Sequence, residues 1–104
     1  VVAAQAGTVR FAGWRRGYGV TIELDHGFGW HSRYAHLRAA VVRRGAAVGA
    51  GELIGRVGAT GLVTGPHLHF ELHYAGQPLD PLPFLRAGLS DKSRFDAMMA
   101  ARLK

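Results

Sequence analysis

Six histidines are the residues of this chain most suited to chemistry, and three of them stand close together near residue 70. Side chains alternate between the two faces of a β-strand, so every second residue of a strand shares a face. A strand over 67–74 therefore places four polar residues on one face, namely His67, His69, Glu71 and His73. It places three apolar residues on the opposite face, namely Leu68, Phe70 and Leu72.

Two imidazoles at positions i and i+2 of a strand can both approach one metal ion, or one can bind the metal while the other moves protons. The tripeptide His67-Leu68-His69 alone is equally compatible with two exposed strand histidines. His36 ends another expected strand and reads by itself as a surface or partly buried histidine. Asp25 and His26 precede Gly27 and are interpreted as turn residues. His31 and His73 receive no functional role.

The elements that must hold these residues are short strands separated by glycines. Residues 20–25 alternate cleanly between apolar and polar side chains, which is typical of a half-buried strand. Further strands are expected over 8–12, 30–37, 53–57 and 67–74. This spacing predicts an all-β protein with an antiparallel sheet or sandwich. A short amphipathic helix is expected over 90–104, with an apolar face that packs on the domain or, alternatively, binds a partner.

Composition excludes several classes of protein. The chain has 104 residues, no cysteine and 13 basic against 7 acidic residues. A thiol nucleophile, a disulfide scaffold and a cysteine-ligated zinc finger are therefore ruled out. No basic run is interleaved with aromatics, so no nucleic-acid partner is expected. No apolar run is long enough for a membrane span. A lipoyl or biotin carrier needs a modifiable lysine on a hairpin tip, but both lysines, Lys92 and Lys104, lie in the expected helix.

Several segments, taken in order, resemble one known family. Tyr34-Ala35-His36-Leu37 is similar to its Tyr-Ala-His-Leu motif, and residues 44–58 are similar to its glycine-spaced segment. Residues 64–71, with the sequence Thr-Gly-Pro-His-Leu-His-Phe-Glu, are similar to its most diagnostic motif. The chain thus resembles the lysostaphin-type, LytM-like zinc metallopeptidase domain of peptidoglycan endopeptidases. The likeness covers residues 1–85, and residues 86–104 form a C-terminal tail.

The resemblance implies an antiparallel β fold with a groove that holds zinc and binds a peptidoglycan peptide in the cell envelope. In the family, a His and an Asp from an upstream His-x-x-x-Asp motif bind the metal with the second His of His-x-His, which is His69 here. The remaining motif histidines, His36 and His67, would serve the metal-bound water and the transition state. Such a site leaves one zinc position open for water.

The upstream His-x-x-x-Asp motif does not occur in this chain. We therefore expect an incomplete zinc site that needs a missing segment or a second chain, and we expect this chain to be inactive alone. The alternative is a non-catalytic member that regulates cell-wall amidases. Such members usually lose the groove histidines, whereas His36, His67 and His69 are all present here, which favours the enzyme.

Overall fold

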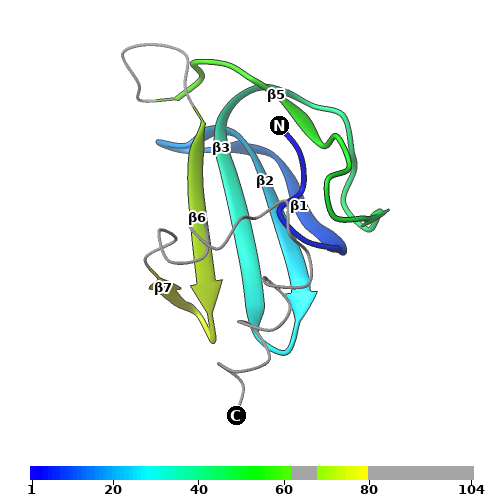
Figure 1. The fold of residues 1–104 in the computed structure, drawn as a ribbon. Coiled ribbons are helices and arrows are strands. Elements are labelled where there is room, and N and C mark those ends of the chain that lie inside the picture. The colour runs from blue at the N-terminus through cyan, green and yellow to red at the C-terminus, as the bar shows by residue number, and fades with distance from the viewer. Residues whose placement is uncertain (62–67, 80–104) are drawn as a thin grey trace.

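The computed structural model describes residues 1–61 and 68–79, and within them the chain forms one antiparallel sheet (Figure 1). The strand order is β4-β1-β2-β3-β6-β7, and β5 pairs with β3 outside this path. No helix occurs in these residues, so none of them forms a helix that could span a membrane. The strands are β1 (Gly7–Arg15), β2 (Gly19–Gly27), β3 (Trp30–Ala40), β4 (Ala47–Val48), β5 (Gly55–Val57), β6 (His69–Tyr74) and β7 (Gln77–Leu79).

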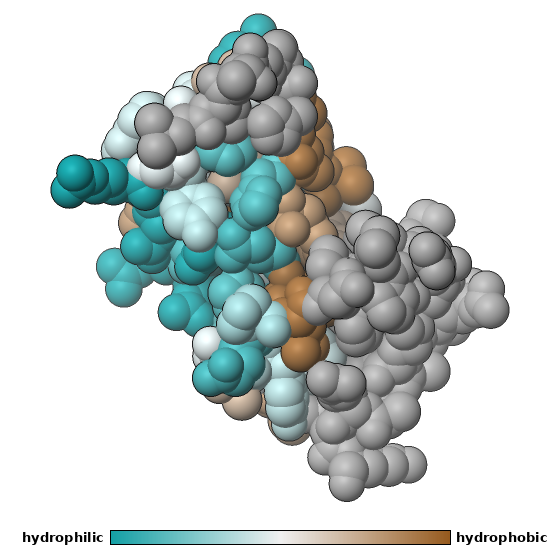
Figure 2. Space-filling model, turned by 90° about the vertical axis from the view of Figure 1, so that its left-hand side faces the viewer, coloured by the Kyte–Doolittle hydropathy of each residue, from teal (hydrophilic) through white to brown (hydrophobic). Residues whose placement is uncertain are grey.

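Alternation in the central strands separates an apolar face of the sheet from a polar one. In β2, Ile22 and Leu24 are fully buried, and they pack with Tyr34 and Leu37 of β3 in the main core. Glu23, which lies between them in sequence, is paired with Arg33 of β3 on the other face. Viewed from the side of β6 and β7, polar residues gather on one part of the surface beside a band of apolar ones (Figure 2).

The expected antiparallel β fold is confirmed, and each expected strand coincides with an observed one apart from its ends. Two short strands, β4 and β7, were not predicted, because two or three residues carry no recognisable alternation. Leu68 lies just before β6 and is 40% exposed, so its predicted core position is wrong. The expected helix over 90–104 and the tail from 86 onward lie outside the described residues and stay predictions.

The turn interpretation of Asp25 and His26 is wrong, because both residues belong to β2 and the turn is formed by Phe28 and Gly29. The His26 ring instead joins the N-terminal segment to the sheet. Its Nδ1 donates to the Ala6 carbonyl at 2.8 Å, and its Nε2 lies 2.7 Å from the Ser32 hydroxyl. The Ser32 hydroxyl in turn lies 3.1 Å from the Tyr34 hydroxyl. The Tyr34 hydroxyl accepts a hydrogen bond from the Ala4 N–H at 2.8 Å.

Candidate active site

A bulge in β3 places His36 on the polar face of the sheet. Regular alternation would put His36 on the same face as the buried Tyr34. Between the pairs Ile22–Tyr34 and Val20–Leu37, however, β3 advances three residues while β2 advances two. His36 has a φ of 59°, in the left-handed region. The extra residue turns His36 out of the core and returns Leu37 to it, as bulges beside active sites commonly do.

The His36 ring is fixed in position by two backbone carbonyls. Its backbone N–H donates to the Tyr18 carbonyl at 2.7 Å, and its Nδ1 lies 2.7 Å from the Thr60 carbonyl oxygen. A carbonyl oxygen only accepts hydrogen bonds, so Nδ1 carries the proton. In the neutral ring, Nε2 is then the basic nitrogen, which is the state that a general base requires.

The loop residue Thr60 is held against the β1–β2 hairpin by a hydrogen bond of its hydroxyl and by close approach to Gly19. The Thr60 hydroxyl donates to the Leu37 carbonyl and accepts the Val20 N–H at 3.0 Å. Gly19 has a φ of +70°, and a Cβ at this position would lie 2.4 Å from the Thr60 hydroxyl oxygen. Only glycine allows the hairpin and the loop to approach this closely.

His69, at the start of β6, faces His36 across the polar face. Their ring centroids lie 5.7 Å apart with the rings in an edge-on arrangement, and Tyr18 lies 6.0 Å from His69 and 6.5 Å from His36. The Nε2 of His69 contacts Glu71 Oε2 at 2.7 Å. This contact fixes the ring and makes Nδ1 the nitrogen that can bind a ligand. Because Ala35 pairs with His69 in the β3–β6 register, the bulge and the two histidines lie at the same level of the sheet.

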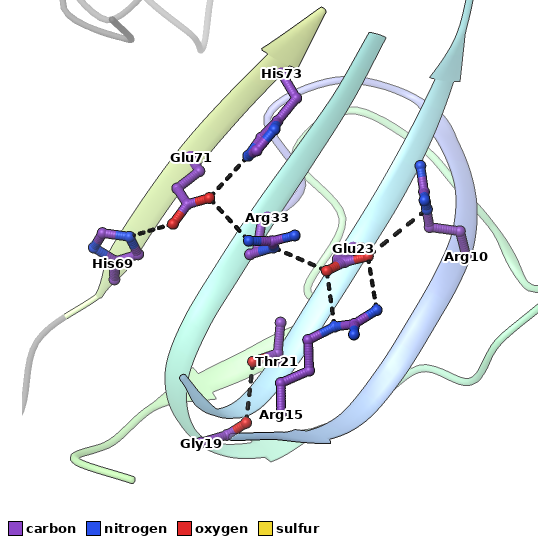
Figure 3. A network of polar contacts seen from close by, with 9 residues as sticks. All are labelled: Arg10, Arg15, Gly19, Thr21, Glu23, Arg33, His69, Glu71 and His73. Atoms are coloured by element: carbon purple, nitrogen blue, oxygen red, sulfur yellow. Dashed lines mark hydrogen bonds and ion pairs between the residues drawn. The ribbon is translucent and has the colours of Figure 1, made fainter. Parts of the chain in front are cut away.

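A network of charges extends from His69 across four strands (Figure 3). Glu71 accepts from His73 at 2.8 Å and from Arg33 at 3.1 Å, and Arg33 also binds Glu23 at 2.8 Å. Burial raises the pKa of Glu71, but the hydrogen bonds from His73 and His69 and the charge of Arg33 outweigh this and lower the pKa below its usual 4.5. Glu71 is therefore a carboxylate at neutral pH.

The side chains that the structure describes do not by themselves fit a catalytic zinc ion. Among residues 1–61 and 68–79, no three His, Cys, Asp or Glu side chains converge on one point. His69 is the described residue of the implied ligand set, and its contact with Glu71 is the kind that commonly orients a metal-binding histidine. The third predicted site residue, His67, lies outside the described residues.

Sequence reasoning placed His36 and His69 in the site but missed their neighbours. Tyr18 lies between Gly17 and Gly19, and an aromatic residue between two glycines is a signal that a turn presents a side chain. Thr60 and Arg33 gave no local signal, because their importance depends on contacts across the sheet. His73, left without a role, binds the same carboxylate as His69.

This fold and sequence match a known peptidase family. The sequence profile described as peptidase family M23 matches residues 1–81. The chain belongs to peptidase family M23. Its structure is similar to the catalytic domain of lysostaphin from Staphylococcus simulans, with a TM-score of 0.77 and 38% identity over 83% of this chain and 69% of that one. A zinc-containing peptidase from Vibrio cholerae superposes with a TM-score of 0.68 and 37% identity over 73% of this chain and 24% of that one.

Curated relatives in the M23 family include an enzyme and an activator. The chain is 42% identical over 101 residues to the DD-carboxypeptidase/endopeptidase Mpg of Neisseria meningitidis, covering 93% of this chain and 23% of that protein. It is 39% identical over 85 residues to the murein hydrolase activator EnvC of Escherichia coli, covering 82% of this chain and 20% of that protein. The chain thus spans about a fifth to a quarter of the length of these relatives.

Proposed function

We propose that this M23 domain is the peptidase domain of a zinc metalloendopeptidase that hydrolyses peptide cross-links of peptidoglycan in the cell envelope. The observation that carries the proposal is the pair formed by His36 and His69. The two rings face each other at 5.7 Å, and Glu71 occupies Nε2 of one while the Thr60 carbonyl occupies Nδ1 of the other. The His69 ring is thus oriented to bind a metal ion, and the His36 ring is oriented to accept a proton.

The two histidines have different tasks in this proposal. His69 is the family's third zinc ligand, with Glu71 as the residue that orients its ring. His36 has Nε2 as its basic nitrogen, so it can hold a proton taken from the attacking water or stabilise charge that develops on the substrate. His67 shares the proton-transfer task with His36. Glu71 stays ionised beside three cationic or basic groups, so it positions His69 and does not exchange protons itself.

We propose zinc binding for the whole protein and not for the 104-residue chain alone. The described residues do not make a site of three ligands, and a catalytic zinc needs about three from the protein. We propose that a segment or second chain carrying the His-x-x-x-Asp ligands completes the site, and that the 104-residue chain alone is inactive.

A second candidate function, regulation of cell-wall amidases without catalysis, is favoured by the likeness to the activator EnvC. The two functions differ in what they require of the groove. An activator needs no basic nitrogen at His36 and no carboxylate behind His69, yet this chain has both. We therefore prefer the enzyme.

The test is digestion of purified peptidoglycan by the whole protein, followed by chromatography and mass spectrometry of the soluble fragments. The enzyme is expected to convert cross-linked dimers to monomers without any added amidase, and His69→Ala is expected to abolish this. If fragments are released only when an amidase is added, and if the His69→Ala protein supports this release as well as the wild type does, the protein is a regulator and not the enzyme.

A further inference from the structure

A polar hollow of about 400 Å³ lies on the same face of the sheet as His69, at the other end of β6. Its walls come from four strands and include the side chains of Arg10, Glu23, His31, Arg33 and His73. His73 lies four residues beyond His69 on β6, which corresponds to ~13 Å along a strand. The hollow is therefore separate from the histidine pair, yet an extended peptide of a few residues would reach both.

The acidic side chain in the wall of the hollow is already neutralised. Glu23 is only 5% exposed and contacts three arginines. Arg33 and Arg15 approach its Oε2 at 2.8 and 3.0 Å, so the charge of the carboxylate is balanced by neighbours on the same face of the sheet. Arg33 is committed further, because it also binds Glu71. These contacts leave neither Glu23 nor Arg33 available to a ligand.

Arg10 differs from the other two arginines. Its contact with Glu23, at 3.7 Å, is too long for a hydrogen bond, and its side chain is 48% exposed, against 42% for Arg15 and 23% for Arg33. A guanidinium has five N–H donors in a fork that matches a carboxylate. Within the part of the chain that the structure describes, none of the Arg10 donors makes a hydrogen bond. Arg10 therefore brings to the hollow a positive charge that has only a long ion pair with Glu23 and still has its N–H donors for a ligand.

The other polar group at the rim is His31. Burial lowers the pKa of His31 below the usual 6.5, and the charge of Arg10 lowers it further, against the opposite effects of Asp25 and Glu23. Asp25, half exposed, lies 3.9 Å from His31 Nε2, which is also beyond hydrogen-bond range. Arg10 and His31 both line the hollow, so an anionic ligand there can contact them while Glu23 keeps its contacts with Arg15 and Arg33.

We infer that this hollow is a specificity subsite in which Arg10 and His31 bind a carboxylate of the peptide substrate, several residues from the bond that is cleaved. The inference rests on the proposed function, because it assumes that the polar face receives a peptide. Arg10 and His31 would recognise the substrate, and His36 and His69 would keep the catalytic roles proposed above.

Two synthetic cross-linked peptides test the subsite. They are identical except that one has a free carboxylate on the stem, away from the scissile bond, and the other has a carboxamide there. Calorimetry with the whole protein carrying His36→Ala, in which the peptides are expected to be cleaved only slowly, is expected to show about tenfold weaker binding of the carboxamide, which is the size of effect given by one charge-assisted hydrogen bond. Arg10→Gln is expected to remove this preference. The matched control, Arg16→Gln, changes an exposed arginine of the β1–β2 turn and is expected to keep it.

The outcomes separate this inference from the proposed function. Equal affinity of the His36→Ala protein for the two peptides, or a full tenfold preference after Arg10→Gln is added to it, would overturn the subsite. Melting curves show whether Arg10→Gln folds, and His31→Gln is a second variant that must also weaken the preference. Hydrolysis of either peptide by the wild-type protein tests the proposed function independently, because neither result depends on the other.

Discussion

At the scale of single residues, the site depends on which ring nitrogen of each histidine carries a proton. The Thr60 carbonyl fixes the proton of His36 on Nδ1, and the Glu71 carboxylate binds Nε2 of His69. The two imidazoles thereby differ in which ring nitrogen carries the proton, Nδ1 in His36 and Nε2 in His69. Their neighbours therefore separate a binding role from a proton-transfer role, which residue type alone does not distinguish.

Replacing His36 by Ala in the whole protein is expected to slow peptide hydrolysis by about 10²–10⁴-fold, because one acid–base group is lost. Zinc content is expected to stay as in the wild type. Rates on a cross-linked peptide and metal analysis of the same samples check this. A rate within a factor of two of the wild type would show that His36 handles no proton in the reaction.

The network around Glu71 predicts a particular pH dependence of stability. Its pKa lies below 4.5 in the folded chain, so the ionised form stabilises the fold above pH 4.5, and this contribution is lost as the pH falls through the lowered pKa. Glu71→Gln is therefore expected to be less stable than the wild type at pH 6 and to approach it as the pH drops towards 3. Urea denaturation at several pH values measures this. A difference that grows with acidity would contradict the assignment.

At the scale of elements, the site is built where a hairpin, a bulge and a loop meet. The hairpin contributes Tyr18, the bulge of β3 contributes His36, and the loop after β5 contributes Thr60. Tyr18 and Thr60 each contact His36 through a backbone carbonyl, so no long side chain is needed to place the His36 ring. Gly19 is the point where the hairpin and the loop touch.

Gly19→Ala is expected to destabilise the chain more than Gly17→Ala does. Both glycines have positive φ, of +70° and +83°, so both substitutions carry the strain of a left-handed alanine, about 1–2 kcal/mol. A Cβ on Gly17 meets nothing within 4 Å, whereas one on Gly19 collides with Thr60. Thermal melting compares the two variants. Equal melting temperatures would show that the contact between hairpin and loop does not constrain the site.

At the scale of the whole molecule, alternation predicted most of the sheet, whereas His36, His67 and His69 were named as site residues from the family resemblance and stay predictions. The shared face of His69, Glu71 and His73 was predictable, because β6 is regular over these residues. The approach of His36 was not, since it needs a bulge that breaks alternation. The apolar residues at positions 34 and 37, three apart, are the signal that could have located it.

Several contacts of the site join residues that are far apart in the sequence, so local sequence patterns do not predict them. The loop residue Thr60 meets β2 and β3 at separations of 40 and 24 residues. The Arg33–Glu71 ion pair spans 38 residues. The hollow beside Arg10 likewise needs side chains from several strands at once. No pattern within one segment contains this information, because the strand register brings these residues together.

Metal analysis of the whole protein tests the central claim most directly. We expect about one tightly bound zinc per molecule in the wild type and in His36→Ala and His67→Ala, and none in His69→Ala with its fold retained. The 104-residue chain alone is expected to bind no zinc tightly. Full zinc in His69→Ala, or one zinc held wholly within the 104-residue chain, would contradict the account.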